Sequence, residues 1–272
     1  MGAVMKDKML QDLHACLDAW LDADREVAAQ QIEHLKAIGG QALDLDTAQA
    51  NAEELRLRFA GEAREHLHLF VEGGEGRSPE GLQEIAAKLS PGGAHTGGAL
   101  ISIIRAHCGW WIDPTIAAAV IYQNWDGGKA GFQFLPDPRE TDEGEYWNEA
   151  DALLGLFFEA GGPDALLIGE DRAFFESLPD RFTVYRGAAG ASEQTLATGL
   201  CWTTRRPVAE WFAHRSAEMT KAEPVLLTAR VSKTDIALAL AGECEIITMP
   251  ARARRLKCRP QAAGYRPEFG WR

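Results

Sequence analysis

The sequence predicts an α+β protein in which a helical N-terminal domain precedes an antiparallel sandwich of short strands. Two observations lead to this prediction. Through the first half, apolar residues recur at the three- and four-residue spacing of amphipathic helices. After Pro179, the pattern changes to short runs of β-branched and aromatic residues with one helical segment among them. No GxGxxG motif follows a predicted strand, which argues against a Rossmann-type doubly wound sheet.

The first two predicted helices are long and amphipathic. The first carries an apolar stripe of Met9, Leu10, Leu13, Cys16, Leu17, Trp20 and Leu21, and we expect it to end at Gly39-Gly40. A second helix is expected to begin at Asp46 and to end at Gly73-Gly74. Its predicted apolar face consists of Ala52, Leu55, Phe59, Leu67 and Phe70.

Two further helices are marked by a capping residue followed by proline, which fits the first helical position. Ser78-Pro79 predicts a helix that stops at Ser90-Pro91, and Asp113-Pro114 predicts one that includes the apolar run 116–122. Residues 124–144 are rich in Gly, Pro and acidic residues and are predicted to form a linker or long loop. The expected domains are therefore 1–144 and 145–272.

The second predicted domain begins with helices over 146–160 and 170–177. Its expected strands are 182–185, 199–204, 225–231, 236–240 and 245–249, with a helix from Pro207 to Met219 between the second and third. Many short strands with a single helix between them favour a mixed α+β sandwich.

Charge and cysteine content narrow the function classes. The 28 Lys and Arg against 40 Asp and Glu give a net charge of -12, which argues against a broad nucleic-acid surface. A local basic cluster consists of Arg252, Arg254, Arg255, Lys257 and Arg259. We expect it to be a solvated strand edge, with contact to a nucleic acid as the alternative. Five widely spaced cysteines without a CxxC pair indicate neither disulfides nor a metal site.

No apolar run of membrane-spanning length and no signal-peptide pattern occurs in the chain. The expected compartment is therefore the cytoplasm, and no membrane partner is expected.

Three short clusters of residues in the C-terminal domain suggest a function when they are considered together. Arg186-Gly187 follows the first predicted strand, Trp202-Thr203-Thr204 lies at the end of the second, and Glu243-Cys244-Glu245 begins a later strand. Each is weak alone, since two glutamates at i and i+2 on a strand simply share a face. Their order along one chain is far less common by chance.

In this order the clusters resemble the R-S-E class of mono-ADP-ribosyltransferases, which includes clostridial binary toxins and arginine-specific enzymes. The resemblance extends from Phe182 to about Lys257. It implies a split β-sandwich ADP-ribosyltransferase domain that cleaves NAD as a substrate and needs no metal. The family also carries an aromatic residue and, three residues on, an Arg in the helix that follows its Ser-Thr-Ser strand; Phe212 and Arg215 match that spacing.

The residue types suit this chemistry. A guanidinium binds phosphate oxygens bidentately, so Arg186 would hold the NAD pyrophosphate, with Arg215 as a second contact. Gly187 would let the backbone approach the nicotinamide, and the ring of Phe212 would pack against it. Trp202, Thr203 and Thr204 fill the place of the Ser-Thr-Ser strand and are the remaining cofactor-binding candidates.

The two glutamates and Arg186 are the catalytic candidates. Loss of nicotinamide leaves oxocarbenium-like charge on the ribose, which a carboxylate stabilises, and Glu245 is the candidate for that role. Glu243 would orient and deprotonate the acceptor. The resemblance associates Glu-x-Glu with arginine, so protein arginine is the first-choice acceptor, with nucleic acid as another.

One departure from the family concerns its first Ser, which hydrogen-bonds the catalytic Glu. Trp202 stands there, so either Thr204 or Cys201 takes the orienting role or the alignment is off by one residue. Two other functions stay open: an NAD glycohydrolase, and an inactive sandwich that serves as an interaction module. The N-terminal domain would select the target, inhibit the enzyme or bind an antidote protein, as expected of an intracellular toxin or defence effector.

Overall fold

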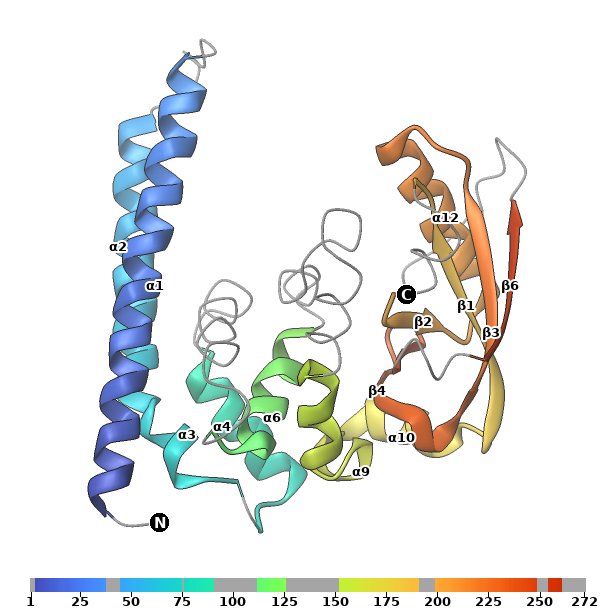
Figure 1. Ribbon diagram of the computed structural model, residues 1–272, viewed down its shortest axis with the longest axis horizontal. Coiled ribbons are helices and arrows are strands. Elements are labelled where there is room, and N and C mark those ends of the chain that lie inside the picture. Colours follow the sequence, from blue (N-terminus) through green and yellow to red (C-terminus); the bar gives the residue numbers. More distant parts are fainter. Residues whose placement is uncertain are drawn as a thin grey trace. The chain divides into compact units, whose positions relative to one another are not determined.

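The computed structural model describes residues 3–37, 45–74, 76–90, 112–125, 152–190, 199–248 and 254–260. The chain divides into two compact units, Met1–Phe134 and Leu135–Arg272. The first is helical, and the second combines helices with an antiparallel sheet (Figure 1). The α+β class predicted from the sequence is therefore confirmed. The predicted linker falls almost wholly outside the described residues.

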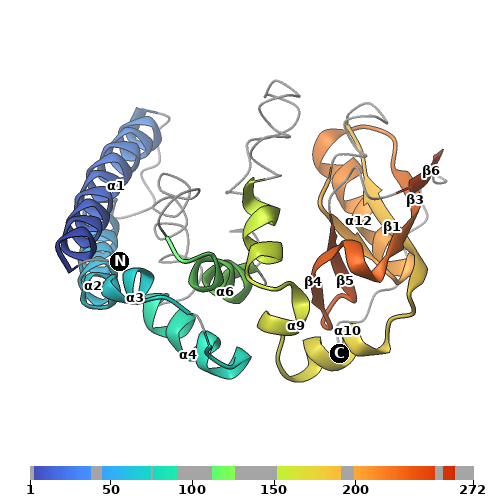
Figure 2. The same cartoon turned by 60° about the horizontal axis from the view of Figure 1, so that its bottom comes forward.

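Two long helices, α1 (Ala3–Ala37) and α2 (Leu45–His66), lie side by side in both ribbon views (Figures 1 and 2). Of the predicted stripe on α1, Met9, Leu13, Leu17 and Leu21 are buried, whereas Leu10 and Cys16 are half-buried. The predicted face of α2 is partly wrong, because Ala52 is exposed and Leu55 is 44% exposed. Among the described side chains of α2, the first buried one is Ala60, and the side chain of Phe59 lies outside the description. In the preceding part of the helix the described contacts include the ion pair of Arg25 with Glu53.

The helical run predicted to continue to Gly73 is interrupted at Leu67, where a turn separates α2 from α3 (His68–Glu72). Leu67 in this turn and Phe70 in α3 are both fully buried. The two proline-marked helices follow as α4 (Pro79–Leu89) and α6 (Pro114–Trp125), which pack against each other.

Both predicted caps are present at these helices. The Ser78 hydroxyl accepts a hydrogen bond from the Gly81 amide at 3.2 Å, and Asp113 accepts from the Thr115 amide at 2.8 Å. Side-chain oxygens here satisfy backbone donors that have no partner within the helix. The sequence signals that started the two helices are therefore the groups that stabilise them.

The second unit begins with a helical stretch over 152–159, then α9 (Pro163–Leu166) and α10 (Gly169–Ser177). The sheet strands are β1 (Arg181–Ala188), β2 (Cys201–Thr203), β3 (Val225–Ser232), β4 (Ile236–Leu240), β5 (Glu245–Thr248) and β6 (Arg254–Pro260). Helix α12 (Arg206–Thr220) connects β2 and β3. The five predicted strands are confirmed within three residues at each end. Edge strand β6 adds four residues of the basic cluster, while Arg252 lies outside the described residues.

The six strands follow the order β4-β5-β2-β1-β3-β6, and every neighbouring pair is antiparallel. The order contains two groups, β4-β5-β2 and β1-β3-β6. Within the second, β1 and β3 are paired from Arg181–Ser232 to Ala188–Val225. Between the groups, β1 and β2 share a single registered pair, Tyr185 with Thr203. The two groups therefore diverge next to this pair.

Helix α12 packs against β1, and α9 and α10 pack against β4 (Figures 1 and 2). Every residue of β4 is buried. Among the described residues, no helix has both the length and the apolar character required to cross a membrane.

Candidate functional site

The first candidate residue, Arg186, lies where the two groups of strands diverge. Its Nη1 donates a hydrogen bond to the Cys201 carbonyl oxygen at 2.8 Å, which ties β1 to β2. A Cβ added to Gly199 would lie 2.0 Å from Arg186 Cζ. The guanidinium therefore packs directly against the Gly199 backbone, and a side chain at position 199 would displace it.

The Nε atom of Arg186 is buried and has no hydrogen-bond partner among the described residues. A buried donor on a charged group that lacks a partner is costly, and such groups in native proteins generally have a specific reason. An anion bound at this place would supply the acceptor. The unpaired donor is therefore consistent with a site for a phosphate or carboxylate group.

Gly187 is required by packing between β1 and α12. A Cβ at this position would lie 1.7 Å from the Ala209 carbonyl oxygen and 2.4 Å from the Ala213 nitrogen. Helix and strand thus meet backbone to backbone, which only glycine permits. The expected reason for this glycine was close approach of a ligand; the structure gives close approach of a helix instead.

Strand β2 directs its side chains alternately to the two faces of the sheet, as in any strand. Trp202 is 2% exposed, and its indole nitrogen donates to the Gly199 carbonyl oxygen at 2.9 Å. It is a core residue, and its ring is not accessible to a ligand in this structure. Cys201 and Thr203 lie on the opposite face from Trp202.

Thr203 and Thr204 hold the Glu-x-Glu segment through its backbone. Thr203 Oγ1 donates to the Glu243 carbonyl oxygen at 2.8 Å, and the Thr204 amide donates to the Cys244 carbonyl oxygen at 3.0 Å. Thr203 also pairs in register with Glu245 across β2 and β5. The two threonines therefore act as structural ties to the candidate glutamates.

Cys201 connects the arginine with the glutamates. Its pairing with Ile247 places it diagonally across from Glu245 on the same face. Loss of hydration at its partly buried position raises the pKa of the Cys201 thiol well above its usual value. The nearby Glu245 carboxylate raises that pKa further, and Arg186 opposes the shift. The thiol thus stays protonated at neutral pH and hydrogen-bonds the carboxylate of Glu245. Glu243 is close enough to contribute to the same pKa shift.

The sequence leaves open whether Thr204 or Cys201 orients Glu245, or whether the alignment is off by one residue. A hydrogen bond with Glu245 is among the causes that raise the pKa of the Cys201 thiol, and this favours Cys201 for the orienting role. Strand β2 consists of Cys201-Trp202-Thr203, one residue earlier than the segment that the resemblance places at Ser-Thr-Ser. Because side chains alternate between the two faces of a strand, a shift of one residue changes which side chains face the site.

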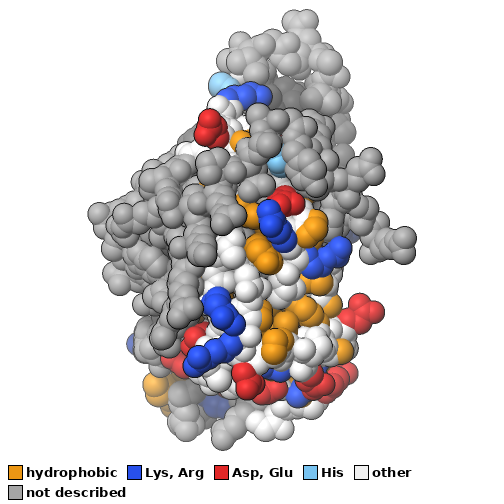
Figure 3. Space-filling model, turned by 90° about the vertical axis from the view of Figure 1, so that its right-hand side faces the viewer, with side chains coloured by type: hydrophobic (Ala, Val, Ile, Leu, Met, Phe, Trp, Pro, Cys, Tyr) orange, Lys and Arg blue, Asp and Glu red, His pale blue; other side chains and the backbone are white. Residues whose placement is uncertain are grey.

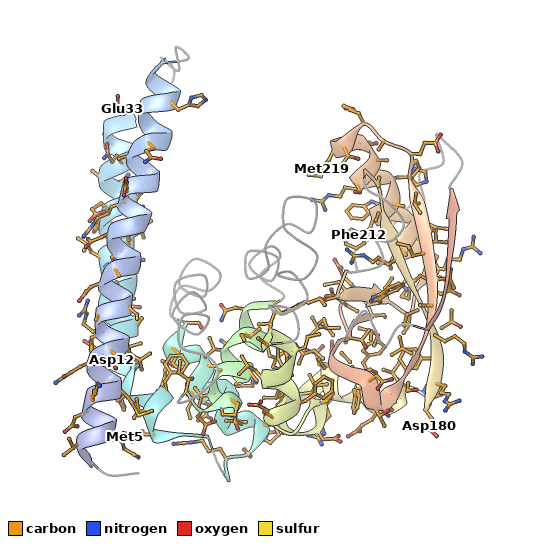
Figure 4. The ribbon with its side chains drawn as sticks, viewed as in Figure 1. Met5, Asp12, Glu33, Asp180, Phe212 and Met219 are labelled. Atoms are coloured by element: carbon orange, nitrogen blue, oxygen red, sulfur yellow. The ribbon has the colours of Figure 1, made fainter. Side chains whose placement is uncertain are left out.

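The two candidates on α12 belong to a separate cluster. Phe212 contacts Trp211 edge to face, with ring centroids 4.9 Å apart, and the Arg215 guanidinium lies 5.1 Å from the centroid of the Trp211 ring. Figure 4 shows Phe212 and Met219 projecting from this helix. Trp211 was not among the predicted site residues, although an aromatic residue next to Phe212 is visible in the sequence.

The structure therefore brings Arg186, Cys201, Glu243 and Glu245 together from three separate segments, whereas Phe212 and Arg215 contact Trp211. In the described part of the chain, no group of three or more His, Cys, Asp and Glu side chains is arranged to hold a metal ion.

Comparisons with models of protein families, with curated proteins and with solved structures find no match to this chain. The resemblance to R-S-E mono-ADP-ribosyltransferases therefore depends on the residues and their arrangement alone.

Proposed function

We propose that the C-terminal unit is a split-sandwich mono-ADP-ribosyltransferase that uses NAD as a substrate and transfers its ADP-ribose to an acceptor. One observation carries the proposal. An arginine from β1, the strand β2 and a Glu-x-Glu segment that leads into β5 are separate in sequence, yet they are neighbours around Cys201. A guanidinium and two carboxylates at one place offer both an anion site and a means to stabilise positive charge.

In this proposal Arg186 binds the NAD pyrophosphate. Its Nη1 is used by the Cys201 carbonyl, and its buried Nε is the donor that needs an acceptor. A phosphate oxygen would satisfy that donor in a charge-assisted hydrogen bond. The residues present thus fit the anionic part of NAD, while Phe212 and Arg215 would supply further contacts to the nicotinamide and the phosphates.

Glu245 stabilises the charge that develops when the bond between the ribose C1′ and the nicotinamide nitrogen breaks. The electron pair of that bond leaves with nicotinamide, and the ribose becomes oxocarbenium-like. The Cys201 thiol holds the Glu245 carboxylate from the side of β2. A carboxylate fixed before the reaction stabilises this charge without having to reorganise.

Glu243 receives the proton of the acceptor as the acceptor nitrogen bonds to C1′. A carboxylate is suited to orient a guanidinium, so protein arginine is the proposed acceptor. The basic edge strand β6 makes a nucleic acid the next acceptor to test. For the helical N-terminal unit we propose target selection, inhibition or binding of an antidote protein, consistent with a toxin or defence effector.

The test follows label from adenylate-labelled NAD in a cell lysate into protein, nucleic acid and free ADP-ribose. We expect wild type to label protein and Glu245→Ala to lower labelling by about a thousandfold, the size of effect found for a lost group that stabilises transition-state charge. Glu223→Gln, an exposed glutamate of the same unit, is the matched control and should label like wild type.

Three outcomes would change the proposal. Label found only as free ADP-ribose, with purified arginine-containing acceptors present, would indicate a glycohydrolase. Label in nucleic acid would change the acceptor class. A folded wild type that neither turns over NAD nor binds it by calorimetry would indicate an interaction module.

A further inference from the structure

The turn Ala241–Cys244 connects β4 and β5 and carries Glu243. It is closed internally by the Cys244 amide, which donates to the Ala241 carbonyl oxygen at 3.1 Å. Cys244 has a φ of 50°, the left-handed conformation that non-glycine residues adopt rarely and at some cost. A turn with such a residue keeps its shape only when the surroundings hold it.

The surroundings hold the turn from two sides. On the side of β2, Thr203 Oγ1 donates to the Glu243 carbonyl oxygen and the Thr204 amide donates to the Cys244 carbonyl oxygen. On the opposite side, the Ala241 amide donates to Asp171 Oδ1 at 2.7 Å. This second anchor comes from α10, seventy positions earlier and outside the segment that resembles ADP-ribosyltransferases.

The Asp171 contact is a strong type of hydrogen bond. Its acceptor is a carboxylate, the contact is partly buried, and α10 packs against β4, which leads into the turn. Loss of the carboxylate would leave the amide of Ala241 without this acceptor while the two ties from β2 remain. The first half of the turn would then be free to shift, and Glu243 would shift with it.

Glu245 is held differently. It lies within β5, in register with Leu240 of β4 and Thr203 of β2, so strands on both sides fix its backbone. Glu243 has no such strand pairing and depends on the anchors of the turn. Removal of the Asp171 carboxylate should therefore displace Glu243 and spare Glu245.

We infer that Asp171 is a positioning residue for Glu243 and thereby determines how ADP-ribose is divided between the acceptor and water. The inference rests on the proposed function. When Glu243 is displaced, the acceptor nitrogen is no longer oriented and deprotonated, whereas Glu245 still supports cleavage of the bond between C1′ and nicotinamide. Water then bonds to C1′ and loses its proton to solvent, which yields free ADP-ribose.

The experiment compares Asp171→Ala and Asp171→Asn with Glu170→Ala in the full chain. Glu170 is an exposed acidic residue in the same first turn of α10, so its variant controls for the loss of a charge near the helix N-terminus. Two quantities are measured for each protein: the ratio of ADP-ribose transferred to an arginine acceptor to ADP-ribose released, and hydrogen exchange at residues 241–244.

We expect Asp171→Ala to lower the transfer ratio by about tenfold, the effect of one lost hydrogen bond to a charged group, with NAD cleavage within about threefold of wild type. Exchange at 241–244 should become faster. Asp171→Asn retains an acceptor oxygen and should recover part of the ratio, and Glu170→Ala should resemble wild type.

A proportional loss of transfer and cleavage in Asp171→Ala would overturn the inference, because it would mean a general structural role. Unchanged exchange at 241–244 would overturn it as well, since the turn would not depend on the anchor. If wild type cleaves no NAD, the proposed function fails by itself, and faster exchange in Asp171→Ala would then show that Asp171 anchors the turn without any catalytic consequence.

Discussion

The C-terminal sheet and the α1–α2 hairpin are held together in contrasting ways. In the sheet unit, the backbone of Gly187 contacts the backbone of α12 directly. The backbone of Gly199 contacts the guanidinium of Arg186 in the same way. In the hairpin beyond Leu21, the contacts described are between charged side chains, such as Arg25 with Glu53 at 2.8 Å. Of the described α2 side chains before Ala60, none is buried.

The difference indicates where each unit tolerates change. A position where two backbones touch accepts no added atom, because the interior is close-packed and adjusts little. An exposed ion pair contributes little to the free energy of unfolding, so either of its two residues can be replaced. The candidate site lies in the close-packed sheet unit, where a catalytic side chain can be held in one geometry. The hairpin offers surface that can vary without loss of the fold.

The largest expected effect comes from breaking the closest contact in the sheet unit. Gly187→Ala would place a methyl group 1.7 Å from the Ala209 carbonyl oxygen, so α12 must move away from β1. We expect a loss of more than about 3 kcal/mol in the free energy of unfolding, the upper end of overpacking costs. Denaturant unfolding of the C-terminal unit, followed by the near-UV signal, measures it.

The control for this variant lies in the hairpin. Gly61 is exposed within α2, and a Cβ there would meet nothing within 4 Å. Gly61→Ala should stabilise the N-terminal unit by about 0.5 to 1 kcal/mol because alanine favours the helix. Similar losses for both substitutions would contradict the contrast between the units.

An intermediate effect, on catalysis rather than on stability, is expected at Cys201. Cys201→Ser retains a hydroxyl donor for Glu245, whereas Cys201→Ala removes it. We expect Cys201→Ala to lower kcat by about tenfold with little change in KM, and Cys201→Ser to stay within about threefold of wild type. Steady-state NAD cleavage separates these results, and equal loss in both variants would mean that the side chain only packs.

The same residue predicts a pH dependence. The folded-state pKa of Cys201 is raised, so its contribution to stability is complete below the ordinary thiol pKa and is lost as the pH rises through the folded value. Wild type should therefore lose stability at alkaline pH relative to Cys201→Ser, which does not titrate there. Thermal unfolding between neutral and alkaline pH measures the difference.

The smallest effect is expected in the hairpin. The hydrogen bond from Arg25 lowers the pKa of Glu53, so this carboxylate stabilises the fold above its unfolded pKa, and the stabilisation disappears as the pH falls through the lower folded value. Glu53→Gln should lower the free energy of unfolding by about 0.5 kcal/mol at low salt and by less at high salt, because solvent and ions screen the ion pair. Thermal unfolding at two salt concentrations tests it; a loss that salt does not change would exclude a screened ion pair.

The sequence predicted most of the elements because their signals are local. Ser78 and Asp113 cap helices that begin next to them, and short runs rich in apolar residues mark β3 and β4. The face of α2 was mispredicted at Leu55 because helical spacing alone does not show how far along the helix its partner extends.

The candidate site was predictable in its charged residues and less so in their supports. In a strand as short as β2, parity depends on the neighbouring strands, so Trp202 was placed at the site and Cys201 was left as one of several alternatives. Asp171 could not be found, since its contact with Ala241 joins segments seventy positions apart and no motif marks it.

The two edge strands of the sheet determine whether copies of the protein can associate through backbone hydrogen bonds. An unpaired strand edge is a template on which another chain can add, and natural sheets protect such edges with covering helices or with charge. Edge strand β4 is buried and packed by α9 and α10, while β6 carries Arg254, Arg255, Lys257 and Arg259. Cationic side chains also appear among apolar ones on the face viewed in Figure 3. A chain cut before Arg254 would uncover the hydrogen-bonding edge of β3 and make aggregation through this strand the main hazard of such a fragment.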